Sequence, residues 1–278
     1  MSAVVRIGNA NVVALSDTEE AYEAGRVYPE VSEADWAPYR DLLGAAGTLL
    51  LNFGCYAIRA DGRTVLVDTG WGPSHQGRLL DELAVAGIAL DEIDAVIFTH
   101  LHGDHIGWNL VSEGVTPRPR FPRARYLAPE ADWLHYTAQP EAGALFREQM
   151  LPLAELGVLD LIGGGYVVSP SITTHATPGH TPGHLSVAIM SRGEHGFVLG
   201  DVAITPIEAQ ETDWLNCFDW NTSMARSTRH EVLDNLEQEG TLVAASHFPR
   251  PGFGRFVRLD GRRVWQPATK PQSVGGRS

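Results

Sequence analysis

Three histidines and an aspartate fall within six consecutive positions, in the run Thr99-His100-Leu101-His102-Gly103-Asp104-His105. Imidazole and carboxylate groups are ligands that suit zinc and other first-row divalent metals. The run directly follows residues 95–98, an apolar stretch typical of a buried strand. Side chains two positions apart on an extended chain point the same way, so His100 and His102 can hold one ion together. Asp104 and His105 follow a glycine and can turn toward a second ion.

Further candidate ligands occur singly, and each follows its own predicted strand. His180 comes after residues 172–176, Asp201 after residues 197–199 and His247 after residues 242–245. Groups at strand ends collect at one edge of a sheet, where rigid strands aim them and loops give access. The sequence therefore predicts that these ligands lie together with those of residues 100–105.

The elements that must position these residues are short strands and helices. Apolar alternation predicts strands over residues 4–7, 11–15, 48–60, 64–67, 95–98, 125–127, 172–176, 185–190, 196–199, 241–245, 255–259 and 263–265. Helical spacing predicts helices over residues 77–86, 129–137, 141–153 and 224–238, the last capped by Asp219, Asn221 or Ser223. Asp61-Gly62 and Asp260-Gly261 are hairpin-turn signals. Patterning alone predicts a mixed α and β protein.

Residues 17–47 differ in composition from the rest of the chain, with many acids and scattered aromatics. Residues 32–43 fit one capped amphipathic helix. We expect this segment to be a flap over the site or an oligomer contact, and a solvated surface excursion is the open alternative.

Size and charge bound the class of protein. With 278 residues and 44% apolar content, we expect a single domain over residues 1–268 and a disordered tail over residues 269–278. A formal net charge of −13 disfavours nucleic acid as a partner, because phosphate backbones need a basic surface. The chain shows neither a membrane-length apolar run nor a signal-peptide pattern at its start, so we expect a cytoplasmic protein. Cys55 and Cys217 are expected to be buried, reduced thiols.

The pattern HxHxDH at the end of an apolar strand resembles the signature of the metallo-β-lactamase superfamily. Other pieces match it in order: Val67-Asp68-Thr69-Gly70, Thr177-Pro178-Gly179-His180-Thr181, Leu199-Gly200-Asp201 and Ser246-His247-Phe248. The resemblance covers about residues 3–266. Gly107-Trp108-Asn109 and residues 214–247 look most like the branch of lactonases and organophosphate hydrolases. The resemblance implies the family's fold, a four-layer αββα sandwich of the α+β class.

The resemblance also implies two metal ions, zinc by default, with manganese, iron or cobalt as alternatives. His100, His102 and His180 would hold one ion, Asp104, His105 and His247 the other, and Asp201 would bridge them. The ions would share a hydroxide, because metal binding lowers the pKa of water to about 7. Asp104 is the candidate proton carrier, and a role as ligand only is the alternative.

The remaining histidines and Asp68 are not expected to bind metal directly. Asp68 and His184 look like groups that orient the ligands, although His184 can equally be an ordinary buried histidine. The histidines without a motif position are expected to be non-ligands: His75, His135, His175, His195 and His230.

The expected chemistry is hydrolysis of a small ester, above all a lactone, by the bridging hydroxide. An organophosphate triesterase, a thioesterase similar to glyoxalase II and a mononuclear iron oxygenase are alternatives. The thioesterase is disfavoured because Gly107-Trp108 replaces that family's Gly-Gly, and a β-lactamase because Asp201 stands where those enzymes use cysteine or a non-bridging residue. A non-enzyme accessory protein is disfavoured by the complete ligand set. A homodimer is left open.

Aromatic residues in or near the presumed loops of the site edge indicate an apolar, uncharged or weakly charged substrate, unless they serve packing instead. These residues are Trp71, Trp108, Trp133, Trp214, Phe218 and Trp220. No GxSxG motif is present, and neither cysteine lies near a histidine motif, so serine and cysteine hydrolase chemistry is disfavoured.

Overall fold

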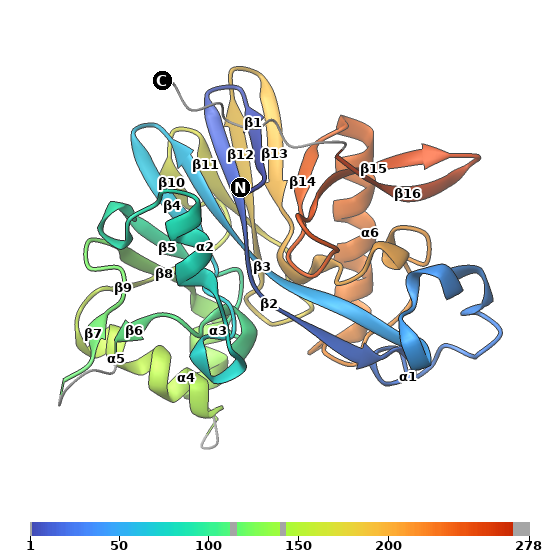
Figure 1. The fold of residues 1–278 in the computed structure, drawn as a ribbon, viewed down its shortest axis with the longest axis horizontal. Helices are drawn as coiled ribbons and strands as arrows, with labels where there is room; N and C mark the ends of the chain where they lie inside the picture. The colour runs from blue at the N-terminus through green and yellow to red at the C-terminus, as the bar shows by residue number, and fades with distance from the viewer. Residues whose placement is uncertain (1, 112–115, 140–142, 269–278) are drawn as a thin grey trace.

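Two mixed sheets pack against each other in the computed structural model, which describes residues 2–111, 116–139 and 143–268 (Figure 1). Helices α2, α3, α4 and α5 cover the outer face of the first sheet, and α6 covers the second. The four layers confirm the predicted αββα sandwich. No helix within the described ranges is long and apolar enough to cross a membrane.

The first sheet has seven strands, with the antiparallel strands at one side and the parallel strands at the other. Its order is β1 (Val4–Ile7), β2 (Ala10–Glu23), β3 (Thr48–Ala60), β4 (Arg63–Val67), β5 (Ala95–Ile97), β8 (Arg125–Pro129) and β9 (Leu159–Ile162). Strands β4, β5, β8 and β9 run parallel. A separate pair, β6 (Leu110–Val111) and β7 (Arg118–Pro119), lies outside both large sheets.

The second sheet also has seven strands, of which only β13 and β14 pair in parallel. Its order is β10 (Val167–Ser169), β11 (Ile172–Ala176), β12 (Leu185–Ser191), β13 (Glu194–Val198), β14 (Leu242–Ala244), β15 (Phe253–Leu259) and β16 (Arg262–Pro267). The helices are α1 (Ala24–Val27), α2 (Leu79–Val85), α3 (Glu130–Thr137), α4 (Ala144–Gln149), α5 (Leu151–Glu155) and α6 (Thr222–Glu239). Short 3-10 helices span Ala37–Leu42, Ala45–Gly47, Pro73–His75, Leu90–Glu92, Gly103–His105, Gly200–Val202 and Pro206–Ala209.

Local sequence signals account for several element ends. Asp61 and Gly62 both have positive φ, at 54° and 74°, as the tight turn between β3 and β4 requires. Helix α6 begins where the side chain of Asn221 accepts a hydrogen bond from the Met224 amide, and it ends at Gly240 in the left-handed conformation. Asn221 was one of the three predicted caps.

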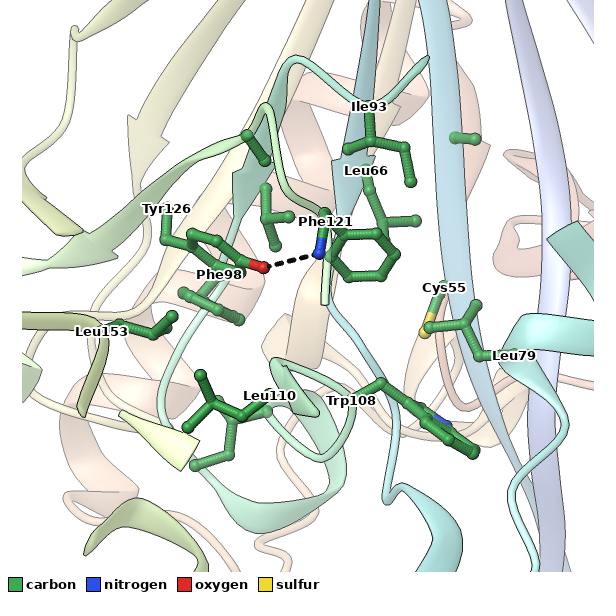
Figure 2. Packing of buried hydrophobic residues seen from close by; sticks show 14 of the residues in the cluster. Cys55, Leu66, Leu79, Ile93, Phe98, Trp108, Leu110, Phe121, Tyr126 and Leu153 are labelled. Carbon is green, nitrogen blue, oxygen red and sulfur yellow. Dashed lines mark hydrogen bonds between the residues drawn. The ribbon is translucent and has the colours of Figure 1, made fainter. Parts of the chain in front are cut away.

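The apolar interior is divided by the first sheet. Between that sheet and its helices, Leu66, Phe98 and Phe121 are fully buried together with Cys55 (Figure 2). The buried Tyr126 hydroxyl accepts a hydrogen bond from the Phe121 amide at 3.1 Å, so its polar atom is satisfied (Figure 2). A second cluster fills the space between the sheets. Both cysteines are free thiols, as expected, but only Cys55 is buried and Cys217 is exposed.

Residues 17–47, expected to be a flap or an oligomer contact, have a different secondary structure from the predicted one. Residues 17–23 continue β2, which pairs with β3 as far as Glu23 with Thr48, and the long hairpin reaches away from the sandwich (Figure 1). The predicted helix over residues 32–43 is wrong, since only the 3-10 helix Ala37–Leu42 forms. Tyr28, Trp36 and Tyr39 are instead buried against Trp214, with ring centroids 4.8 to 5.6 Å away. Packing of these rings outweighs the helical pattern.

Two further predictions need correction. The single helix over residues 141–153 is two helices, α4 and α5, because Pro152 has no amide hydrogen and its ring blocks a continuing helix. Residues 141 and 142 lie outside the described ranges. Strands β6, β7, β9 and β10 were not predicted. The predicted tail, residues 269–278, is also outside the described part of the chain.

Candidate metal centre

Four strands deliver the candidate ligands to one place. His100 follows β5 of the first sheet, while His180, Asp201 and His247 follow β11, β13 and β14 of the second. Beyond β5, the 3-10 helix Gly103–His105 carries two more of them. The candidate ligands therefore lie together, as predicted, but they come from the edges of two sheets and not from one edge of a single sheet.

Three histidines form the first cluster. Nδ1 of His102 lies 3.0 Å from Nε2 of His100 and 3.0 Å from Nε2 of His180. All three side chains are buried or nearly so, and their facing nitrogens lie close enough to hold one ion.

The second cluster contains Asp104, His105, Asp201 and His247. Oδ2 of Asp104 lies 3.4 Å from Nε2 of His105 and 3.5 Å from Nε2 of His247. Oδ2 of Asp201 lies 3.0 Å from Nε2 of His247. The set combines two carboxylates with two imidazoles, which suits a divalent first-row metal.

Asp201 contacts both clusters. Its Oδ2 atom lies 3.2 Å from Nε2 of His180 and 3.8 Å from Nε2 of His100, in addition to its contact with His247. Gly200 has φ +59°, and a Cβ there would lie 2.6 Å from Nε2 of His184. A glycine is therefore needed directly before Asp201 for the chain to pass this close to His184.

Most histidines of the two clusters are held through the ring nitrogen that faces away from the cluster. Nδ1 of His105 bonds Oδ2 of Asp68 at 2.8 Å, so Asp68 orients an imidazole as expected. Nδ1 of His180 bonds Oδ1 of Asp219 at 2.9 Å, and Nδ1 of His247 bonds the carbonyl oxygen of Asn52 at 2.9 Å. These contacts fix each ring so that Nε2 faces the site.

His184 has a different outer role from the one expected. Its Nε2 atom accepts a hydrogen bond from the amide of Asp201 at 2.8 Å, and its Nδ1 atom lies 2.8 Å from Oγ1 of Thr177. It therefore positions the backbone of Asp201 and contacts no ligand imidazole through a ring nitrogen.

Burial and charge set the protonation of the first cluster in the metal-free protein. Burial lowers the pKa of His100 well below its ordinary value, and burial with the neighbouring His180 lowers the pKa of His102 to about 4. Both rings are thus neutral at neutral pH, the form that binds a metal. Burial also disfavours the charged form of His180, but Asp201 and Asp219 outweigh it and raise the pKa of His180 to about 9. A metal ion must displace that proton, so metal binding releases protons.

The donor atoms fit a cation in each cluster. Within the described residues, Nε2 of His105 and Oδ1 of Asp201 are buried without a hydrogen-bond partner. Such a buried polar atom costs about 1 to 3 kcal/mol unless something satisfies it. In the first cluster, the single Nδ1 atom of His102 cannot donate to two ring nitrogens at once. One cation per cluster would satisfy these atoms.

The comparison with protein families agrees with this geometry. The profile of the Metallo-beta-lactamase superfamily matches residues 55–255. The chain belongs to the metallo-β-lactamase superfamily. It is a metal-dependent hydrolase.

Among relatives of this superfamily member, the N-acyl homoserine lactonase AiiA of Bacillus thuringiensis subsp. kurstaki is 24% identical over 218 residues, covering 69% of this chain and 80% of that protein. The uncharacterized protein YobT of Bacillus subtilis (strain 168) is 27% identical over 232 residues, covering 78% and 89%. The crystal structure of the hydrolase AbOPH has a TM-score of 0.86, with 20% identity and coverage of 96% and 97%. The dizinc quorum-quenching lactonase AidC has a TM-score of 0.84 at the same identity and coverage. At this identity, the two structures show a shared fold.

A pocket of about 270 Å³ opens over the clusters of this metallo-β-lactamase superfamily protein. Its floor contains His102, Gly103, Asp104, His180, Asp201 and His247, and its walls contain Tyr22, Leu51, Phe53, Trp71, Ile204 and Phe218. Of the predicted aromatic residues, Trp71 and Phe218 thus line the pocket. Trp108, Trp133 and Trp214 pack in the interior instead, and Trp220 is half exposed.

A bulge in β2 places the Asp17 carboxylate where it binds the buried side chain of Trp108. The pairing of β2 with β3 shifts between Ser16 and Thr18, which leaves Asp17 as the extra residue. Its buried carboxylate accepts hydrogen bonds from Nε1 of Trp108 at 2.8 Å and from the Gly72 amide at 3.1 Å. Asp17 thereby fixes the loop that carries Trp71 into the pocket.

Sequence reasoning missed several residues of the site. Asp219 was considered only as a helix cap, and Tyr22, Leu51, Phe53, Asn52 and Ile204 were not assigned a role. No motif marks them: Asp219 and Asn52 act through histidines distant in sequence, and the others line the pocket only once the chain is folded. The five histidines predicted as non-ligands, at positions 75, 135, 175, 195 and 230, belong to neither cluster.

Proposed function

We propose that seven residues hold two divalent ions, zinc by default, and that the protein hydrolyses small uncharged esters, above all lactones. In this proposal, His100, His102 and His180 hold one ion, Asp104, His105 and His247 hold the other, and Asp201 bridges them. The contact of Asp201 with both clusters is the observation that carries the dinuclear proposal. We further propose that residues 1–268 form one metallo-hydrolase domain.

When bound, a pair of divalent ions supplies a hydroxide nucleophile at neutral pH and stabilises negative charge that develops on oxygen. Asp104 can move the proton. Its carboxylate lies beside His105 and His247 and also lines the pocket, so it faces the space that a nucleophile and a substrate would occupy. It can accept the nucleophile's proton and pass it to the oxygen that leaves when the ester C–O bond breaks. A lactone plus water would then give a hydroxy acid.

The pocket supports an uncharged substrate. Among the described residues that line it there is no lysine or arginine to pair with a substrate carboxylate or phosphate. The walls are mostly apolar, and Phe53, Trp71 and Phe218 offer flat surfaces to an apolar substituent. This lining disfavours β-lactams and glutathione thioesters, which carry carboxylates. AiiA and AidC are lactonases, which supports lactones among the neutral esters.

A phosphotriester is the second candidate, because it too is neutral and suits the same nucleophile and the same lining.

Metal analysis and a substrate panel test the proposal. Protein purified without chelator should contain two ions per chain by elemental analysis, and one ion or none after zinc supplementation would contradict the dinuclear site. The same preparation should hydrolyse lactones faster than open esters, thioesters and phosphotriesters. A clear preference for phosphotriesters would favour the second candidate.

A further inference from the structure

A linked set of side chains forms one wall of the pocket. The hydroxyl of Tyr22 donates a hydrogen bond to Oε2 of Glu20 at 3.0 Å, and Oε1 of Glu20 lies 2.9 Å from Nδ1 of His75. The ring of His75 stacks on Trp71, with centroids 4.2 Å apart and planes 19° from parallel. Tyr22 and Trp71, which both line the pocket, are therefore held in place relative to each other through Glu20 and His75.

The strand register places Tyr22 on the pocket side of the hairpin. Glu20 pairs with Leu51 and Thr18 with Phe53, and both partners on β3 line the pocket. Because side chains alternate along a strand, Tyr22 shares this face, whereas Glu19 points to the other. Phe218 meets the Tyr22 ring edge-on at 6.1 Å and limits its movement.

The Tyr22 hydroxyl donates its proton to Glu20 and can accept a hydrogen bond from the pocket. Burial, the hydrogen bond to Glu20 and the charges of Glu20 and Asp104 raise the pKa of Tyr22 well above its ordinary value, so the phenol is protonated at neutral pH. Its one proton lies toward Glu20, which leaves the oxygen lone pairs free to accept. The other described wall side chains cannot accept: the indole of Trp71 only donates, and Leu51, Phe53, Ile204 and Phe218 have no polar side-chain atom.

We propose that Tyr22 determines substrate specificity: its phenolic oxygen accepts a hydrogen bond from an O–H or N–H group that the substrate carries beside the reacting ester. This inference rests on the proposed hydrolysis of small esters at the same site. Glu20 sets the direction of the hydrogen bond by holding the phenolic proton.

Three lactones of one ring size test this role. α-Hydroxy-γ-butyrolactone offers a donor, α-methoxy-γ-butyrolactone offers only an acceptor, and γ-butyrolactone offers neither beside the ring. The wild-type protein should favour the hydroxy over the methoxy compound in kcat/KM. Tyr22→Phe should reduce that ratio about 2- to 12-fold, the range for one hydrogen bond, and the rate with γ-butyrolactone measures any general loss of activity in the variant.

Glu20→Ala is the sharper variant. Without Glu20 the phenolic proton is free to point into the pocket, so the preference should move toward the methoxy compound. A merely structural loss would slow all three substrates alike. Glu19→Ala removes the same charge from the exposed face of the same strand and should leave the ratios unchanged.

Binding of the three lactones to metal-free protein, measured by titration calorimetry, separates this inference from the proposed function. If the lactones bind in a way that depends on Tyr22 but none is hydrolysed, the proposed function is contradicted and the role of Tyr22 is supported. Turnover with equal ratios in wild type, Tyr22→Phe and Glu20→Ala would overturn the role of Tyr22 alone. Neither turnover nor binding would overturn both.

Discussion

Oδ1 of Asp219 lies 2.9 Å from Nδ1 of His180, and this contact determines which nitrogen of the imidazole faces the first cluster. The other oxygen of Asp219 lies 3.3 Å from Nη2 of Arg229, a guanidinium that is fully buried on α6. Arg229 also pairs with Glu208 at 3.2 Å and donates to the carbonyl of Val202, directly after Asp201. The buried guanidinium of Arg229 thus links Asp219, the partner of His180, to the chain directly after Asp201.

Loss of the Asp219 carboxylate should weaken metal binding. Asp219→Ala leaves His180 free to rotate and less basic, so we expect metal affinity to fall about 10- to 100-fold, as for other removed partners of ligand histidines. Chelator competition measures the change, and Asp219→Asn should lose less because an amide oxygen still accepts. Asp213→Ala, which removes an exposed partner of His230, is the control. Equal affinities in all three variants would show that Asp219 does not support the site.

Removal of the bridging carboxylate should have a far larger effect than removal of an exposed histidine. Asp201→Ala or Asp201→Ser takes away the carboxylate that contacts both clusters, so metal occupancy and activity should both be lost. His195→Ala changes an exposed residue of β13 and should do little. Elemental analysis and initial rates measured on the same preparations check this contrast. Similar occupancy and activity in the two variants would refute the bridge.

Asp104→Asn should separate metal binding from proton transfer. The amide keeps the shape and one oxygen donor but cannot carry a proton, so the rate should fall by about 10²- to 10⁴-fold. At least the ion held by His100, His102 and His180 should remain. The loss should shrink for esters with good leaving groups, which need little protonation to depart. If the defect were independent of leaving-group pKa across a series of aryl and alkyl esters, Asp104 would be a ligand only.

Asp61 should stabilise the fold in a pH-dependent way. Its carboxylate, in the β3–β4 turn, accepts hydrogen bonds from the Ser169 hydroxyl at 2.6 Å and the Ser171 amide at 2.8 Å, which joins the first sheet to the second. These bonds, the Ser169 hydroxyl first, lower the pKa of Asp61 below its ordinary value of 3.8. The stabilisation is therefore present above pH 4 and is lost as the pH falls through the lowered pKa.

The melting temperature of Asp61→Asn should lie about 2 °C below that of the wild type at neutral pH, as expected for about 1 kcal/mol in a domain of this size. The gap should close below pH 4. Asp260→Asn makes the same exchange at the β15–β16 turn and is the control. A gap that persisted unchanged at low pH would mean that the Asp61 charge is not responsible.

The sequence by itself determined those parts of the site that depend on the spacing of nearby residues and on their position after a strand. The spacing from His100 to His105 and the placement of His180, Asp201 and His247 after strands were enough to predict that these side chains meet. Short-range pattern places each ligand at the end of a strand, and neighbouring strands of one sheet end at a shared edge, but the packing of the two sheets brings His100 to the ligands of the second sheet. The hairpin turn at Asp61-Gly62 was predictable for the same reason, because only a few residues fix its geometry, and the cap of α6 was narrowed to three residues that include Asn221.

Only the tertiary structure decided which residues support and enclose the ligands. Asp219 meets His180 across 39 positions, and the carbonyl of Asn52 meets His247 across 195. Residues 32–43 do not form the helix that their pattern predicts, because Trp36 and Tyr39 pack on Trp214, which is distant in sequence. Tyr22 reaches the pocket because β2 continues past the bulge at Asp17. Such contacts depend on how whole elements pack, and local sequence pattern does not record that packing.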